Sequence, residues 1–101
     1  MELKPGSRWK SLVCSTEAVV VRSPSQPVTL ECGGVQMIAH TATGVPAAGA
    51  PELMKGTQVG KRYLDTDTAL ELLCVKSGEG TLSASGRLLP MKDAKRLPAS
   101  D

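Results

Sequence analysis

The amino-acid sequence predicts an all-β protein, and three observations support this prediction. The 10 glycines and 7 prolines divide the chain of 101 residues into short segments. Several of these segments are rich in β-branched residues or alternate between apolar and polar residues, as strands do. No window of about ten residues has the apolar periodicity of an amphipathic helix. We therefore expect an N-terminal β-hairpin module followed by a C-terminal β-meander.

Residues 1–40 are expected to form the N-terminal β-hairpin module. Glu17–Arg22 contains three consecutive valines, and β-branched side chains favour an extended backbone. Two prolines then interrupt the chain, and Val28–Cys32 alternates apolar and polar residues, which places its apolar side chains on one face of a strand. These two segments predict a hairpin with a loose loop. The Gly33-Gly34 pair predicts a turn into a further short strand.

Residues 41–60 differ in composition from the rest of the chain. Thr43–Pro51 is small, uncharged and rich in glycine and proline. Two interpretations of residues 41–60 stay open: a mobile linker, or an ordered arm draped over a neighbouring molecule. Both interpretations divide the chain into an N-terminal and a C-terminal part.

Residues 61–101 are expected to form the C-terminal β-meander with a polar tail. The polar Asp65–Thr68 turn lies between the segments Lys61–Leu64 and Leu70–Lys76, and this arrangement predicts a hairpin. The glycines of Ser77–Gly80 predict a second hairpin, in which the chain returns alongside Leu70–Lys76.

A last turn is predicted at Ser85-Gly86, leading from Thr81–Ser83 into Arg87–Leu89. The polar tail, residues 91–101, is expected to be one helical turn or an arm.

Charge and hydropathy limit the class of protein. The 12 basic and 10 acidic residues give a formal net charge of +2, too small and too scattered for a dedicated nucleic-acid-binding protein. No run approaches the roughly 20 apolar residues of a membrane-spanning helix, and the first residues lack the apolar stretch of a signal peptide. We therefore expect a cytoplasmic protein with neither a nucleic acid nor a membrane as partner.

Aromatic residues are scarce, because Trp9 and Tyr63 are the only two in the chain. Large aromatic side chains supply much of the buried area of a small core, so we expect a thin core. A thin core and unpaired strand edges favour association. We expect a homo-oligomer or a subunit of a larger complex that buries these side chains against a partner: Trp9, Val19, Val21, Leu70 and Leu72.

The three cysteines, Cys14, Cys32 and Cys74, are an odd number, and cytosolic thiols are normally reduced. We therefore do not expect a disulfide framework. Cys74 lies within an apolar strand and is expected to be a core residue. Cys32 follows Cys14 by 18 residues, within the segment Leu30-Glu31-Cys32-Gly33-Gly34-Val35-Gln36-Met37.

This pattern, over about residues 10–38, resembles the desulforedoxin family and the related N-terminal module of desulfoferrodoxin. The resemblance implies a small β module in which four thiolates hold one iron. It makes Cys14 the second cysteine of a Cys-x-x-Cys knuckle and Cys32 the first of a later pair, with Met37 at the matching apolar position. The chain departs from the family where Ser11 and Gly33 replace the other two cysteines, so two of the four implied ligands are missing.

A tetrahedral iron or zinc site needs four donors, and soft thiolates suit it. Cys14 and Cys32 meet this requirement if a symmetric dimer brings two pairs together. They also meet it if His40 and a carboxylate such as Glu17 complete the ligand set. Both arrangements stay open at this point.

The sequence contains no recognisable catalytic constellation, because His40 is the only histidine and no Gly-x-Ser-x-Gly motif is present. We therefore predict a small non-catalytic accessory or interaction protein without a resident cofactor, acting as an oligomer or within a larger complex. The alternative is a small protein that binds iron or zinc through Cys14 and Cys32 for structure or electron transfer. A third interpretation, an enzyme with Cys14 as nucleophile, requires an electropositive environment that the sequence supplies only through Lys10.

Overall fold

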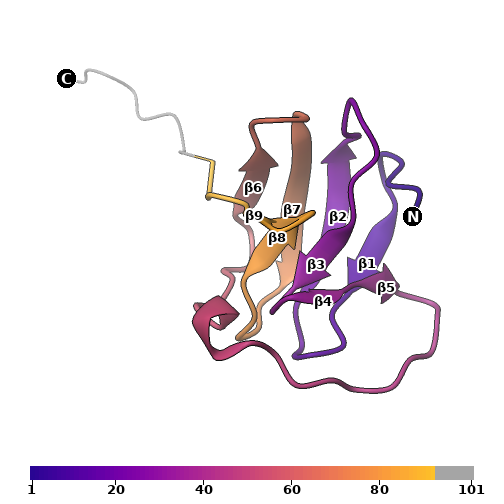
Figure 1. Ribbon diagram of the computed structural model, residues 1–101. Coiled ribbons are helices and arrows are strands. Elements are labelled where there is room, and N and C mark those ends of the chain that lie inside the picture. The colour runs from indigo at the N-terminus through magenta and orange to yellow at the C-terminus, as the bar shows by residue number, and fades with distance from the viewer. Residues whose placement is uncertain (93–101) are drawn as a thin grey trace.

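The computed structural model describes residues 1–92 and shows a protein built almost entirely of β-strands (Figure 1). The strands form two antiparallel sheets, which confirms the predicted all-β class. Within the described residues, the helical structure is limited to one 3-10 turn, η1 (Pro51–Leu53). None of residues 1–92 belongs to a helix long and apolar enough to cross a membrane.

The larger sheet has five strands in the order β5-β1-β2-β7-β6. In chain order these strands are β1 (Arg8–Lys10), β2 (Glu17–Arg22), β5 (Ile38–Ala39), β6 (Arg62–Asp65) and β7 (Leu70–Lys76). β2 and β7 lie at its centre, where Val20 stands opposite Leu72 and both side chains are buried. The valine-rich segment therefore becomes a central strand, as β-branched residues favour.

The smaller sheet has four strands in the order β4-β3-β8-β9. They are β3 (Leu30–Cys32), β4 (Val35–Gln36), β8 (Leu82–Ala84) and β9 (Arg87–Leu88). The Gly33-Gly34 turn joins β3 to β4, and the Ser85-Gly86 turn joins β8 to β9. Ser85 and Gly86 have φ values of 49° and 86°. Two positive φ values are the requirement of a tight type I′ hairpin turn, so these two predicted turns are confirmed.

The chain connects the two sheets along both of their sides. On one side, β4 of the smaller sheet leads through buried Met37 directly into β5 of the larger sheet. On the other side, Met91, which follows β9, forms an antiparallel bridge with Tyr63 of β6. Three of the four edge strands, β4, β5 and β9, have two residues each. The fourth, β6, is bonded along its outer side, because the Leu64 amide donates to the Pro90 carbonyl and the Lys92 amide donates to the Arg62 carbonyl. The long unpaired edges expected from the sequence are therefore not found in residues 1–92.

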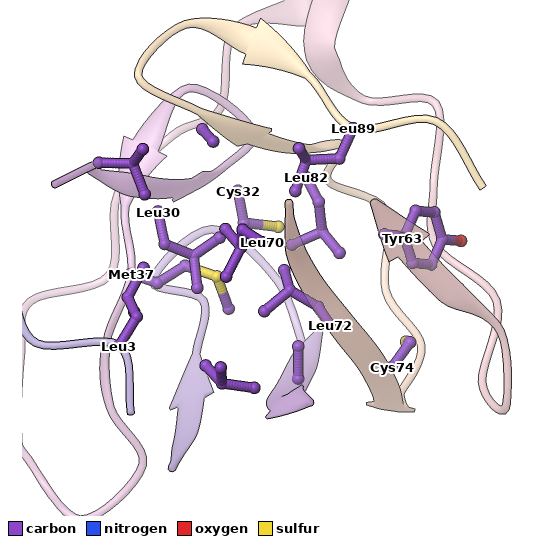
Figure 2. Close-up of a cluster of buried hydrophobic side chains, with 14 residues drawn as sticks. Leu3, Leu30, Cys32, Met37, Tyr63, Leu70, Leu72, Cys74, Leu82 and Leu89 are labelled. Atoms are coloured by element: carbon purple, nitrogen blue, oxygen red, sulfur yellow. The ribbon is translucent and has the colours of Figure 1, made fainter. Parts of the chain in front are cut away.

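The core lies between the two sheets and contains side chains from both (Figure 2). Leu70 and Leu72, which we expected to be buried against a partner, are fully buried within the chain itself. Trp9 packs against this core while partly exposed, and Val21 is 38% exposed. Cys74 is buried at 1% exposure, which confirms the prediction of a core residue. The core is aliphatic, with Tyr63 as its buried aromatic ring.

Two of the predicted hairpins are wrong. β2 and β3 belong to different sheets, so Glu17–Arg22 does not pair with Val28–Cys32. β7 and β8 also belong to different sheets, and β8 pairs instead with β3. The hairpin of β6 and β7 around the Asp65–Thr68 turn is confirmed. The wrong hairpins share one cause: each connection crosses from one sheet to the other instead of turning back within a sheet.

Both sheets combine strands from residues 1–40 with strands from residues 61–92, since β2 pairs with β7 and β3 with β8. Residues 41–60 therefore connect two parts of one folded unit. They run along one end of the molecule (Figure 1) and are hydrogen-bonded to their own chain. The Ala47 amide donates to the Leu12 carbonyl at 2.8 Å, and the Ala50 amide donates to the Gly33 carbonyl at 3.0 Å. These hydrogen bonds join residues 41–60 to their own chain, and the two interpretations of the segment, a mobile linker and an arm over a neighbouring molecule, stay predictions. The tail predicted for residues 91–101 lies outside the described residues from 93 onwards.

Candidate functional site

The structure brings Cys14 and Cys32 together, with their sulfur atoms 3.8 Å apart. Cys14 lies in the turn between β1 and β2 of the larger sheet, and Cys32 is the last residue of β3 in the smaller sheet. Figure 2 shows the Cys32 side chain among the core residues. Cys32 is 0% exposed, whereas Cys14 is partly exposed at the margin of the core. One thiol therefore faces the interior and the other lies nearer the solvent.

The turn that carries Cys14 is organised by the hydroxyl of Ser11. The Ser11 Oγ accepts hydrogen bonds from the amides of Val13 (2.9 Å) and Cys14 (3.2 Å). It also lies 3.7 Å from the Cys14 Sγ. Ser11 and Thr16 close the turn, since the Ser11 amide donates to the Thr16 carbonyl at 2.9 Å. Ser11 thus fixes the direction in which the Cys14 side chain points.

Two further groups contact the Cys14 sulfur. The amide of Gly80 donates to it at 3.2 Å, and the Thr16 Oγ1 lies 3.1 Å from it. Thr16 is fully buried, and its hydroxyl is 3.0 Å from that of Thr57. The Thr57 hydroxyl in turn accepts a hydrogen bond from the Gly78 amide at 3.1 Å. Cys14 therefore lies at one end of a hydroxyl network that reaches the Ser77–Gly80 loop.

These contacts give the two thiols different acidities. Partial burial acts to raise the pKa of Cys14, but hydrogen bonds from Thr16, from the Gly80 amide and from Ser11 lower that pKa to about 7. Burial raises the pKa of Cys32 to about 11. Burial also raises the pKa of Cys74. The Cys14 thiol is therefore more acidic than an ordinary cysteine thiol, whereas the Cys32 and Cys74 thiols are less acidic.

Glycine backbone covers the side of the sulfur pair that faces the Ser77–Gly80 loop. A Cβ atom on Gly80 would lie 2.6 Å from the Cys32 Sγ, and a Cβ on Gly78 would lie 2.7 Å from the Cys14 Sγ. Real Cβ atoms do not approach other heavy atoms so closely, so only glycine fits at these positions without a shift of the loop. The glycines that looked like turn residues in the sequence therefore also allow the loop to close over the thiols.

The residues around the pair do not fit the iron site that the family resemblance implies. Such a site needs four thiolates, and Ser11 presents a hydroxyl that already accepts two amides, while Gly33 has no side chain. Residues 1–92 contain no cluster of three or more His, Cys, Asp or Glu side chains that could hold a metal ion. On the side of the Ser77–Gly80 loop, the residues next to the two sulfurs are Gly78 and Gly80, which carry no side-chain ligand.

The two arrangements that would complete the ligand set are not found either. His40 is exposed, and no cluster joins it to the thiols within the described residues. The Glu17 carboxylate is paired with Arg8 at 2.7 Å and with Lys76 at 3.7 Å. A metal shared between two chains needs both sulfurs at the surface, and Cys32 is fully buried.

A solvent-open groove of about 390 Å³ lies beside the Cys14 turn. Lys10–Cys14 forms one wall, and Thr43, Gly44 and Pro46 from the connecting segment form the other. Val45, next to these residues, is 82% exposed. Within the described residues, the amides of Thr43, Gly44 and Val45 donate no backbone hydrogen bond. We call this feature the Lys10–Pro46 groove.

Sequence reasoning identified Cys14 and Cys32 and noted Ser11, but it missed Thr16, Thr57 and Gly80. Gly78 and Gly80 were recognisable in the sequence only as turn residues. Nothing in the local pattern indicates that their loop, more than 60 positions from Cys14, returns to the sulfur atoms. Those contacts depend on the pairing of β3 with β8, which the sequence did not predict.

Comparison with known proteins adds no assignment: this chain matches no family model, no curated protein and no solved structure. The resemblance to the desulforedoxin family therefore depends on residues 10–38 alone.

Proposed function

We propose that this protein is a non-catalytic accessory protein that acts by binding a segment of another protein in the Lys10–Pro46 groove. The observation that carries this proposal is the groove itself, with amides that donate no backbone hydrogen bond within the described residues and an exposed valine beside it. Its volume of about 390 Å³ lies within the range of about 300 to 1,000 Å³ of binding pockets for small groups.

The groove offers the contacts that an extended peptide uses. The amides of Gly44 and Val45, which find no backbone partner among residues 1–92, are able to donate hydrogen bonds to the backbone of an added strand. Leu12, Val13 and Pro46 line the groove and supply apolar surface for side chains of the partner. The Lys10 ammonium, at one end, favours a partner segment that carries a carboxylate.

Residues 1–92 show no catalytic constellation, which supports binding over catalysis. Their buried carboxylates are engaged in ion pairs: Asp65 with Arg87 at 2.8 Å, and Glu71 with Arg62 at 3.0 Å. His40 is exposed, and within these residues no cluster of possible metal ligands includes it. A general base needs to be positioned against a nucleophile, and among the described residues none of this kind is hydrogen-bonded to Cys14.

Site-specific photocrosslinking tests the proposal. A photoreactive amino acid at Val45 is expected to form a covalent adduct with a partner protein in the cells that produce the chain. The matched control is the same amino acid at Val59, which is also exposed, at 60%, and does not line the groove. Adducts at neither position, or equally at both, would contradict the proposed site.

Size-exclusion chromatography with light scattering tests the predicted association separately. The expected result is a mass above that of one 10.6 kDa chain, either alone or with the crosslinked partner. A monomer that stays monomeric at all concentrations and with the partner present would contradict it.

A further inference from the structure

We infer that Cys14 and Cys32 form a redox-active dithiol that closes to an intramolecular disulfide by exchange with an organic disulfide. This inference goes beyond the proposed binding function and does not depend on the Lys10–Pro46 groove. It depends on the distance between the two sulfurs, on their unequal exposure and on the hydrogen bonds that converge on one of them.

Cys14 and Cys32 are close enough to form a disulfide after a small movement. The two sulfurs lie 3.8 Å apart in the reduced protein, in direct contact. A disulfide requires about 2.05 Å, so they need to approach by less than 2 Å, roughly the movement that a small rotation of two side chains provides. Cys14 lies in a turn and Cys32 lies at the end of a strand, next to the Gly33-Gly34 turn. Neither position needs a change in sheet pairing for this approach.

The two thiols differ in exposure and in hydrogen bonding, so they have different roles in the exchange. The sulfur of the partly exposed Cys14 accepts a hydrogen bond from the Gly80 amide at 3.2 Å, and the Thr16 hydroxyl oxygen lies 3.1 Å from it. Both groups stabilise a thiolate at Cys14. The thiolate is the nucleophile in disulfide exchange. Cys32 is fully buried behind it and is able to reach Cys14 but not a bulky substrate. Cys14 is therefore the attacking thiol, and Cys32 is the resolving thiol.

The reaction balances in two steps. The Cys14 thiolate attacks one sulfur of a disulfide RS–SR, a mixed disulfide forms at Cys14, and the first RS⁻ leaves. The Cys32 thiol then loses its proton and attacks the Cys14 sulfur; the Cys14–Cys32 bond forms, and the second RS⁻ leaves and takes up that proton. The protein loses two electrons, and the substrate disulfide is reduced to two thiols by the same two electrons.

The third cysteine, Cys74, is excluded from the reaction by its position. Cys74 is also a thiol in this region, but it is 1% exposed and its Sγ donates to the Lys76 carbonyl at 3.2 Å. Figure 2 shows its side chain apart from that of Cys32. The reaction is therefore specific for one pair of the three cysteines, which gives the experiment an internal control.

Oxidised glutathione is the probe for the test, applied to the full-length folded protein, and peptide mapping by mass spectrometry is the readout. The wild-type protein is expected to gain a Cys14–Cys32 disulfide and to keep Cys74 free. Cys32→Ser is expected to stop at the mixed disulfide, with one glutathione attached to Cys14. Cys74→Ser is the matched control and is expected to form the same disulfide as the wild-type protein.

Three results would overturn the inference. The first is wild-type protein that keeps three free thiols, and the second is a disulfide that includes Cys74. The third is a Cys14–Cys32 disulfide that forms only in urea, because the folded site would then not be the reactive one. Circular dichroism identifies a Cys32→Ser protein that has not folded. In that case Cys32→Ala takes its place, and the wild-type mapping still decides between the outcomes.

Discussion

Cys14 and Cys32 are identical residues in contact with each other, yet their surroundings move their acidities in opposite directions. Hydrogen bonds from Thr16, Gly80 and Ser11 outweigh partial burial and lower the pKa of Cys14 to about 7, whereas burial raises the pKa of Cys32 to about 11. Ser11 and Thr16 act on both sulfurs, so the difference comes from the deeper burial of Cys32, from the Cys14 charge beside it, and from the Gly80 amide, which donates to Cys14. Residue type alone therefore says little about the chemistry of either position.

The first prediction concerns ionisation of Cys14. Ultraviolet absorbance of the thiolate is expected to show a titration with a midpoint of about 7, and Cys14→Ser is expected to remove it. Because this pKa lies below the ordinary value of 9.0, ionisation stabilises the folded protein; the contribution is complete above pH 9.0 and is lost as pH falls through about 7.

Thr16→Val tests the cause of that acidity, since it removes the hydroxyl 3.1 Å from the sulfur. The midpoint is expected to rise towards 9.0. Ser15→Ala is the matched control, because the Ser15 hydroxyl donates to the Ser77 carbonyl at 2.7 Å instead of contacting Cys14. A midpoint that Thr16→Val leaves unchanged would contradict the role given to Thr16.

At the scale of elements, local signals predicted local pairing and failed for the rest. The β3–β4, β6–β7 and β8–β9 hairpins each follow a short turn of glycine, serine, aspartate or threonine, and the sequence predicted all three. The pairing of β2 with β7 and of β3 with β8 joins residues that are at least 49 positions apart. Alternation of apolar and polar residues shows that a strand has one buried face, but it does not identify the neighbouring strand.

The same limit applies to the candidate site. The resemblance to the desulforedoxin family implied a knuckle-like turn that includes Ser11 and Cys14, followed by a hairpin that includes Cys32. The structure brings these residues together. The Gly80 contact with Cys14 joins residues 66 positions apart. It arises from a loop that crosses between the sheets, so no local pattern could reveal it.

The second prediction concerns the loop Ser77–Gly80. Gly80→Ala and Gly78→Ala would place a Cβ 2.6 Å from the Cys32 sulfur and 2.4 Å from the Thr16 hydroxyl, respectively. Each is expected to lower the free energy of unfolding by about 1 to 3 kcal/mol, the usual cost of overpacking. Glu79→Ala, at the exposed position between them, is expected to change it by less than about 0.5 kcal/mol.

Denaturant unfolding measures all three variants. Equal stabilities for Gly80→Ala and Glu79→Ala would show that the loop does not pack against the thiols as described. The Gly80→Ala protein is also expected to lose the acidity of Cys14, because displacement of the loop moves the Gly80 amide away from the sulfur.

At the scale of the whole molecule, ion pairs hold the β6–β9 side of the two sheets together. Asp65 of the larger sheet accepts hydrogen bonds from Arg87 of the smaller sheet at 2.8 Å and from the Thr68 hydroxyl at 2.7 Å. Glu71 on the adjacent strand β7 is paired with Arg62 and with Lys92. Both carboxylates are buried, so their charges depend on these partners.

The third prediction follows from the acidity of these carboxyl groups. The hydrogen bond from Arg87 holds the pKa of Asp65 below its usual value, and Arg62 and Lys92, acting against burial, hold that of Glu71 below its usual value. Because both pKa values are lower in the folded protein, the ionised carboxylates stabilise it at pH values above the ordinary pKa values of 3.8 and 4.5. This stabilisation is lost as the pH falls through the lower pKa values of the folded protein. The melting temperature is therefore expected to fall steeply below about pH 4.

Arg87→Gln is expected to lower the melting temperature at neutral pH and to shift acid unfolding to higher pH. Arg22→Gln, at an exposed position, is the matched control and is expected to leave both unchanged. Identical acid unfolding of the two variants would show that the pair of Asp65 and Arg87 does not hold the sheets together.

The fourth prediction concerns the oxidised protein. A Cys14–Cys32 disulfide would link the turn of the larger sheet to β3 of the smaller sheet across 18 residues. Closing a loop of this length stabilises a folded protein by about 3 kcal/mol, which corresponds to a rise in melting temperature of about 12 to 24 °C for a small domain. Calorimetry of the oxidised and reduced forms measures this rise, and a lower melting temperature after oxidation would contradict the prediction.

Native mass spectrometry tests the central claim, that Cys14 and Cys32 form a dithiol instead of a metal centre. Protein purified without chelator or added metal is measured before and after treatment with oxidised glutathione. The structure predicts metal-free chains that lose the mass of two hydrogens on oxidation, and the same spectrum reports the number of subunits. Iron or zinc bound at one ion per chain, or per pair of chains, would contradict the claim and make the two cysteines metal ligands.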